Sequence, residues 1–126
     1  MTIHDAEVYR QRLEVLLRHR ATRSVTLLIV PQVGELFHIA RAVIAEPSGA
    51  WGIQLCRQID SDQTTNVYET LEKRHFLRAR QVLNSPENLL THTVLHELAH
   101  LENGWGNDRD PACDGWAFEK MGLEAY

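Results

Sequence analysis

The segment from residue 85 to residue 104 most constrains how this chain of 126 residues can fold. Ser85 is placed to cap a helix, Pro86 suits the first helical position, and Gly104 suits the left-handed residue that ends one. Between these signals the apolar residues follow helical spacing: Leu89, Leu90, Val94, Leu95, Leu98 and Leu101. We therefore predict a capped helix over residues 86–103 with one apolar face against the core.

Hydrophobic spacing predicts the other elements. Residues 5–20 suit an amphipathic helix capped by Asp5, and a last helix is expected from Asp110, acting as its cap, to about Met121. The expected strands are "SVTLLIVP", "WGIQLCRQID", half-buried, and "RHFLRARQVLN", at a sheet edge, with "SDQTTN" as a turn. "GELFHIARAVIAE" fits either a helix or a strand. The expected fold is a single α+β domain with a small twisted sheet of three to four strands.

Charge and composition exclude several classes of protein. The net charge is −4 and the arginines are scattered among acids, which argues against a nucleic-acid or membrane-surface partner. No apolar stretch approaches the roughly 20 residues of a membrane span. The charged start, "MTIHDAEVYRQRLEVLLRHR", is not typical of a signal peptide, so we expect a cytoplasmic protein. Cys56 and Cys113 lack a paired spacing, and we expect two free, buried thiols that bind no metal.

The predicted helix carries the pattern His-Glu-x-x-His at His96, Glu97 and His100. Histidines four residues apart lie on the same face of a helix, so both imidazoles can bind one ion. Glu97 flanks that ion and is placed to act as the general base for a metal-activated water. The chain's own composition gives about 0.03 chance matches to this pattern, so we interpret it as a zinc site.

Two histidines leave a third protein ligand to be found. The acidic candidates are Glu102, Asp108, Asp110, Asp114 and Glu119. Glu102 follows His100 too closely and points off the ligand face. The break at Gly104-Trp105-Gly106 lets the chain reverse, so we expect the ligand at the start of the next helix. Asp110 and Asp114 share a face there: one can bind the ion while the other accepts a hydrogen bond from a ligand imidazole.

The segment of about residues 75–120 resembles the gluzincin-type zincin metallopeptidases, and "LLTHTVLHELAH" in a short chain is most similar to minimal ImmA/IrrE-like domains. In that family a helix carrying Glu-x-x-x-Asp follows the histidine motif. "DPACD" fits this pattern with Asp in place of Glu. The resemblance implies a minimal zincin-like fold, Asp110 as the third zinc ligand and Asp114 as the acid that supports a ligand histidine. Because Asp is one methylene shorter than Glu, the two roles can also be exchanged.

We therefore expect a zinc-dependent peptidase that hydrolyses a peptide or protein substrate, with the substrate paired to the last strand of the sheet. The alternative is a domain that keeps zinc for structure or for protein binding. The resemblance also suggests a third possibility, a regulator that acts by limited cleavage. The last alternative is a chain that binds no metal. We expect His92 beside the site or at the surface, His75 on a solvated strand, and Trp105 and Trp116 in the core.

Overall fold

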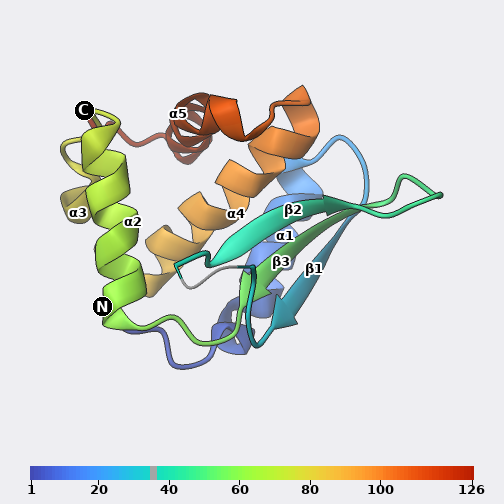
Figure 1. Ribbon diagram of the computed structural model, residues 1–126, viewed down its shortest axis with the longest axis horizontal. Coiled ribbons are helices and arrows are strands. Elements are labelled where there is room, and N and C mark those ends of the chain that lie inside the picture. The colour runs from blue at the N-terminus through green and yellow to red at the C-terminus, as the bar shows by residue number, and fades with distance from the viewer. Residues whose placement is uncertain (35–36) are drawn as a thin grey trace.

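A three-stranded mixed sheet and the helices packed around it make up the described part of the protein, residues 1–34 and 37–126 of a computed structural model (Figure 1). The fold is α+β, as predicted, with three strands. In chain order the elements are η1 (Ala6–Tyr9), α1 (Arg10–Arg20), β1 (Val25–Val30), β2 (Ala40–Ile44), β3 (Trp51–Cys56), α2 (Ser61–Lys73), α3 (Ala79–Val82), α4 (Pro86–Asn103), η2 (Asn107–Arg109) and α5 (Asp110–Met121).

The strand order is β1-β3-β2, with β3 parallel to β1 and antiparallel to β2. The segment for which the sequence allowed a helix or a strand therefore contributes strand β2, and its residues 35 and 36 lie outside the described part. The predicted alternation of β3 is confirmed at Ile53 and Leu55, which are buried, and at Gln54, which is partly exposed, but Cys56 on the expected polar side is buried. Gly52 is buried although it faces away from the helices, because the side chains of Val43 and Leu28 lie over it from the two neighbouring strands.

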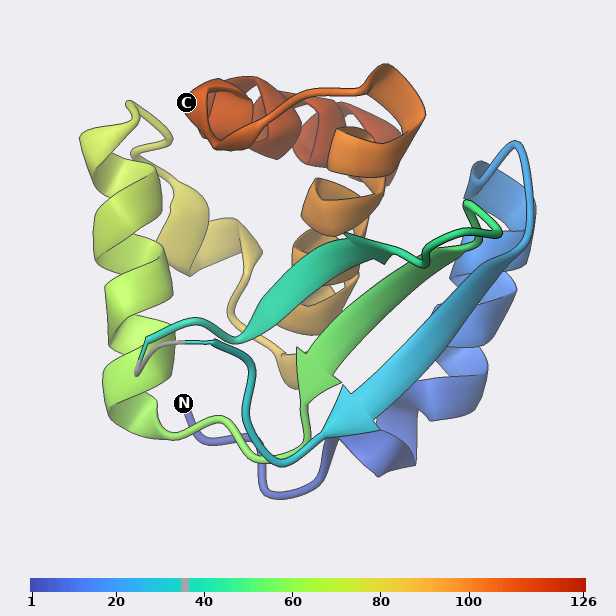
Figure 2. The same cartoon turned by 45° about the vertical axis from the view of Figure 1, so that its right-hand side comes forward.

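Helices α1 and α4 cover one face of the sheet, and Figure 2 shows both behind the strands. Helix α4 contacts β2, β3, α1 and α5, so it is the element around which the core is organised. The residues that were expected to form its apolar face are all buried: Leu89, Leu90, Val94, Leu95, Leu98 and Leu101. None of the helices in residues 1–34 and 37–126 has both the length and the apolar character needed to cross a bilayer.

The predicted ends of α4 are confirmed. The Ser85 hydroxyl accepts a hydrogen bond from the backbone of Asn88 (3.2 Å), Pro86 opens the helix, and Gly104 adopts a φ of 65°. Only a residue that tolerates this left-handed conformation stops a helix cheaply in this way. The chain then turns back through residues 104–106, and α5 packs across the end of α4 (Figure 1).

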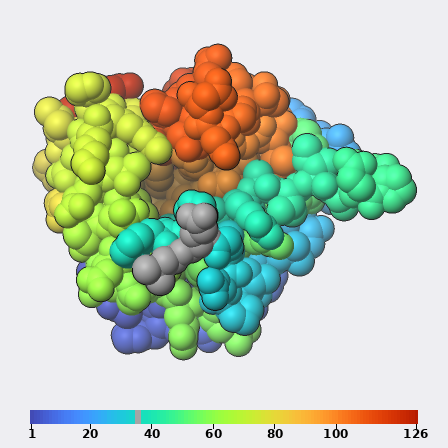
Figure 3. Space-filling model, viewed as in Figure 1, coloured from blue at the N-terminus to red at the C-terminus, as the bar shows by residue number. Residues whose placement is uncertain are grey.

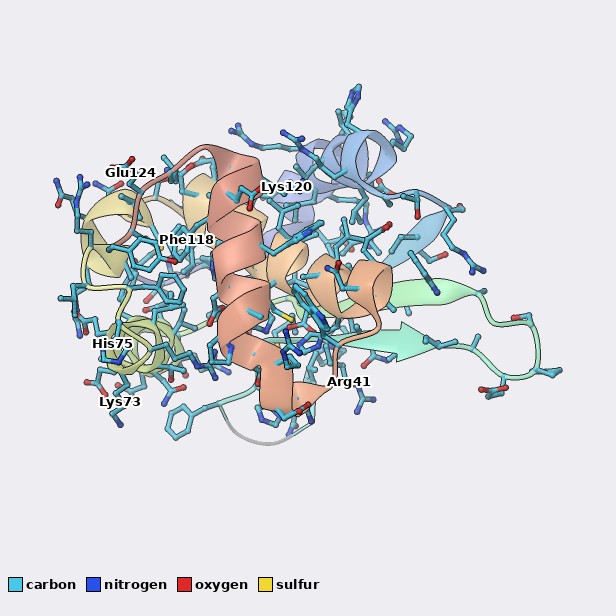
Figure 4. The ribbon with its side chains drawn as sticks, turned by 90° about the horizontal axis from the view of Figure 1, so that it is seen from above. Arg41, Lys73, His75, Phe118, Lys120 and Glu124 are labelled. Carbon is cyan, nitrogen blue, oxygen red and sulfur yellow. The ribbon has the colours of Figure 1, made fainter. Side chains whose placement is uncertain are left out.

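The extent of α5 is as predicted, but its predicted cap is wrong. Helix η2 runs directly into α5, so Arg109 occupies the capping position and Asp110 already has helical dihedrals. The Asp110 carboxylate is therefore not used as a cap and is free for other contacts. Seen from above, α5 lies over α4, with Phe118 on the side of α5 that faces α2 (Figure 4).

Between residues 60 and 84 the predicted turn and edge strand are wrong. Asp60 and Gln63 form a reciprocal capping box that starts α2 at Ser61, and the "SDQTTN" segment is the first turns of that helix. The expected strand "RHFLRARQVLN" contains Arg74, the residue that caps the end of α2, and the short helix α3. The strand was expected to turn Leu77, Ala79 and Leu83 to one side and Phe76 to the other, but Phe76 is buried, at 3% exposed, and Leu77 is 67% exposed.

Candidate metal centre

His96 and His100 lie one turn apart on α4 and both face the same carboxylate oxygen of Asp110. The Oδ1 atom of Asp110 is 3.2 Å from Nε2 of His96 and 2.9 Å from Nε2 of His100. The two imidazole rings are 5.1 Å apart between centroids, and each histidine side chain is 12% exposed. The structure thus brings together the three side chains that the sequence assigned to the metal.

The other ring nitrogen of each histidine already has an acceptor. Nδ1 of His96 is 2.6 Å from Oδ1 of Asp114, and Nδ1 of His100 is 2.8 Å from the carbonyl oxygen of Trp105. A carbonyl only accepts, so His100 donates through Nδ1, which leaves Nε2 as the nitrogen that could bind a metal. An acceptor on the far nitrogen fixes the tautomer in this way in histidine metal sites.

The donor set fits a zinc ion. In a tetrahedral site with Zn–N and Zn–O bonds of about 2.0–2.1 Å, neighbouring donor atoms lie about 3.3 Å apart. The two distances from Asp110 are close to that separation. Asp114 is held away from the shared point by its contact with His96 Nδ1, so the arrangement favours Asp110 over Asp114 as the third ligand.

Negative charge is concentrated at this point of the molecule. Burial opposes the imidazolium form of His96, but hydrogen bonds to Asp110 and Asp114 outweigh it and raise the pKa of His96 to about 10. Burial likewise opposes ionisation of Asp110 and Asp114, while the hydrogen bonds to His96 lower the pKa of each carboxyl. The two carboxylates are thus balanced by a protonated His96, and a divalent cation bound between the histidines would replace that proton.

Cys113 is a further donor beside the histidines that sequence reasoning missed. It is fully buried, and its sulfur lies with ligand nitrogens of His96 and His100 in a group whose atoms are all within 4.8 Å of one another. Burial, followed by the charges of Asp110 and Asp114, raises the pKa of the Cys113 thiol to about 12. The available signal was its spacing: Cys113 follows Asp110 by one helical turn, on the side of α5 that packs on α4.

Glu97 lies between the two histidines and strand β2. Its Oε1 accepts a hydrogen bond from the backbone N–H of Ala42 (2.9 Å), and its Oε2 is 3.8 Å from Nε2 of His96. The side chain is 13% exposed, and burial raises the pKa of its carboxyl. Glu97 is thus a largely buried carboxylate beside Nε2 of His96, at the place where the sequence expected a general base.

Arg74, at the end of α2, reaches the same cluster from the opposite side. Its guanidinium donates to Oδ2 of Asp114 (2.7 Å) and lies 3.7 Å from Oδ2 of Asp110. Sequence reasoning missed this residue because it assigned position 74 to a strand. Arg74 balances part of the acidic charge and ties α2 to α5.

His92, one turn before His96, is buried beside Asp114 and packs on the ring of Phe118 at 4.4 Å between centroids. Its Nε2 is 3.7 Å from Oδ1 of Asp114 and has no hydrogen-bond partner among the described residues. Burial lowers the pKa of His92 to about 4, so the ring is neutral at pH 7. Of the two positions expected for His92, beside the site or at the surface, the structure shows the first: the ring lies in the core beside Asp114.

A cleft of about 550 Å³ opens onto these side chains. One wall is β2 with the preceding residues 37–39, the other wall is α2, and the floor is α4 (Figure 3). The predicted wall, a strand over residues 74–84, is wrong, because residues 75–84 form helix α3 and its flanking turns. The apolar part of the cleft is formed by Phe37, Ile39, Val67 and Leu71.

The remaining candidates lie elsewhere. Glu102 accepts hydrogen bonds from the backbone N–H and the hydroxyl of Thr22, which follows α1. Its side chain therefore points away from the two histidines, as predicted. Asp108 and Glu119 are exposed, as is His75. Trp105 and Trp116 are partly buried and do not line the cleft.

Comparison with known proteins identifies no relative: no protein-family model, no curated protein and no solved structure matches the chain.

Proposed function

We propose that this chain is a zinc-dependent peptidase in which His96, His100 and Asp110 hold the ion and Glu97 is the general base. The observation that carries the proposal is the position of Asp110 Oδ1, within 3.2 Å of Nε2 of both histidines, with Glu97 Oε2 3.8 Å from Nε2 of His96. The resemblance to zincin metallopeptidases remains part of this proposal and rests on the motif and its spacing.

The protein's own groups have separate roles in this scheme. A zinc ion held by these ligands supplies Lewis-acid activation of a water molecule and of the scissile carbonyl. Asp114 and the carbonyl of Trp105 keep the two imidazoles in the orientation and tautomer that ligation needs. Arg74 holds Asp114 in place through its 2.7 Å contact.

Glu97 moves the proton. With Oε1 fixed by the Ala42 N–H, Oε2 is the atom that accepts a proton from the attacking water and returns it to the leaving amine. Burial raises the pKa of this carboxyl, which makes it a stronger base than an exposed glutamate. General acid–base catalysis of this kind contributes about 10²–10⁴-fold in rate.

The edge of β2 supports a peptide as the substrate. The Ile39 carbonyl accepts from the N–H of Cys56 and the Ala45 N–H donates to the carbonyl of Ala50, so the alternation of an antiparallel pair turns the backbone groups of Ala40, Ala42 and Ile44 outward. Because the Ala42 N–H already donates to Glu97, a peptide would pair with the remaining outward groups. An extended peptide can pair with such an edge, as we expected, but on β2 and not on the last predicted strand. The apolar wall on α2 then lies opposite the bound peptide.

The chain is proposed to act in the cytoplasm. Both of its cysteines are free and buried, which is typical of a protein in a reducing compartment.

A second candidate function is a zinc site kept for structure or for binding another protein. The observation that favours it is the sulfur of Cys113 beside the histidines, because sites with four protein ligands are structural. The two functions differ in whether activity depends on Glu97: a peptidase needs its carboxylate as the general base, and a structural site does not.

The deciding experiment measures zinc and hydrolysis together. Protein purified without added metal should contain about one zinc per chain and should cleave members of a peptide library. Glu97→Gln should keep the zinc and lose about 10²–10⁴-fold in turnover. The matched control is Glu119→Gln on exposed α5 surface, which should change neither quantity. Zinc without any Glu97-dependent cleavage would favour the structural alternative, and absence of zinc would reject both.

A further inference from the structure

Cys113 belongs to the same helix face as the two acids of the site. Asp110, Cys113 and Asp114 are at positions i, i+3 and i+4 of α5, and all three contribute to the cluster around His96 and His100. Asp110 is 28% exposed at its side chain and lines the cleft, whereas Cys113 is fully buried and does not. The histidines therefore have an oxygen donor on the solvent side and a sulfur donor on the core side.

We propose that the Cys113 thiolate is a fourth ligand of the ion, together with His96, His100 and Asp110, so that the resting site is closed. This inference rests on the metal-binding half of the proposed function and not on hydrolysis. Cys113 would then be a built-in regulator: the position that a reacting water needs is free only when the sulfur withdraws into the core.

The distances allow this ligation with a small adjustment. With Zn–N bonds of about 2.0–2.1 Å and a Zn–S bond of about 2.3 Å, a tetrahedral site has sulfur and nitrogen about 3.6 Å apart. The sulfur of Cys113 is within 4.8 Å of one ring nitrogen of each histidine, in a group that does not include Asp110, so ligation requires the sulfur to approach the histidine nitrogens by about one ångström. A side-chain rotation of Cys113 or a slight tightening of α5 on α4 supplies it.

The charges balance on ligation. The Cys113 thiol and the Nε2 of His96 each lose a proton to solvent as their bonds to the metal form, and the thiolate and the Asp110 carboxylate together neutralise a divalent cation. A buried ion is stable only when its charge is compensated in this way. Sulfur also selects among cations: a site with a thiolate favours zinc, cadmium or cobalt over magnesium, calcium or manganese.

Cobalt is the probe that tests this ligation, because a cobalt–thiolate bond produces an intense near-ultraviolet charge-transfer band that nitrogen and oxygen ligands do not. Wild-type protein titrated with cobalt(II) should bind about one ion in a four-coordinate site and show this band. Cys113→Ala should still bind cobalt through the remaining ligands but lose the band completely. Cys56→Ala, which removes the other buried thiol on β3, should keep it.

A second measurement needs no variant and so does not depend on Cys113→Ala folding. X-ray absorption of the zinc-loaded wild type should contain one sulfur at about 2.3 Å among nitrogen and oxygen ligands. Cobalt or zinc bound with nitrogen and oxygen ligands alone would overturn this inference and leave the proposed function intact. A wild-type chain that binds neither metal would overturn both.

Discussion

The two sides of the cleft differ in how they are built. On one side, the helix pair α4–α5 packs His96, His100, Asp110 and Asp114 into a largely buried cluster of short polar contacts. On the other side, β2 and α2 contribute backbone groups and apolar side chains that line an open wall. Polar contacts also join the two sides, among them Glu97 with the backbone of Ala42 and Arg74 with Asp114.

This difference separates chemistry from recognition. The candidate ligands come from one continuous segment of 19 residues, 96–114, and their mutual geometry depends mainly on how one helix turns back on the next. The walls come from residues 37–42 and 66–74, far from that segment in sequence. Changes on the α4–α5 side should therefore affect metal binding, and changes on the β2–α2 side should affect stability or substrate binding with the metal retained.

The largest effect is expected from a ligand histidine. His96→Ala removes one nitrogen donor and leaves Asp114 without its imidazole partner, so zinc should fall from about one per chain to near zero. Elemental analysis of the purified variant measures this. His75→Ala, on an exposed histidine, is the control and should keep its zinc. Full zinc occupancy in His96→Ala would show that His96 is not a ligand and would contradict a metal site between α4 and α5.

A smaller effect is expected from the acid that supports His96. Asp114→Asn keeps the shape but removes the charge that holds Nδ1 of His96 and the Arg74 guanidinium. Loss of such a supporting partner costs about 10–100-fold in metal affinity, or about 1.4–2.7 kcal/mol. Competition titration against a chelator measures it, with exposed Asp108→Asn as the unaffected control. If Asp114→Asn lost zinc as completely as His96→Ala, the result would indicate that Asp114 is the third ligand and Asp110 the supporting acid.

The orientation of β2 is tested by two neighbouring prolines. The N–H of Ala40 points out of the sheet and that of Arg41 points to β3, so only Arg41→Pro removes a bond of the sheet. Arg41→Pro should lower the free energy of unfolding by about 1–3 kcal/mol more than Ala40→Pro does. Urea denaturation of both variants measures the difference, and Arg41→Ala corrects for the lost side chain. Equal losses would contradict an outward-facing edge at Ala40.

The smallest effect is expected from the anchor of α2. The buried Tyr68 hydroxyl donates a 2.6 Å hydrogen bond to the carbonyl of Leu83. Tyr68→Phe should cost about 1 kcal/mol in unfolding free energy and leave zinc affinity unchanged. Thermal denaturation and a zinc titration on the same sample test both halves. A fall in zinc affinity would show that the α2 wall and the donor helices are not separable.

Much of the fold could be predicted where sequence signals are local. Ser85, Pro86 and Gly104 define the ends of α4 because they act within a few residues of themselves. The error at residues 60–84 arose although similar signals were present: Asp60 and Gln63 form a capping box, and Val67, Tyr68 and Leu71 follow helical spacing. Polar residues in the first turns of α2 resembled a turn, and a chance alternation over residues 76–83 resembled a strand.

By itself the sequence determined that His96, Glu97 and His100 share one stretch of a buried helix and that an acidic helix follows, because both depend on helical periodicity and local caps. Only the tertiary structure decided which acid meets both histidines, that Arg74 and the sulfur of Cys113 join them, and that β2 and α2 form the walls. These contacts join residues distant in sequence or depend on how whole elements pack, and hydrophobic spacing carries no information about which elements become neighbours.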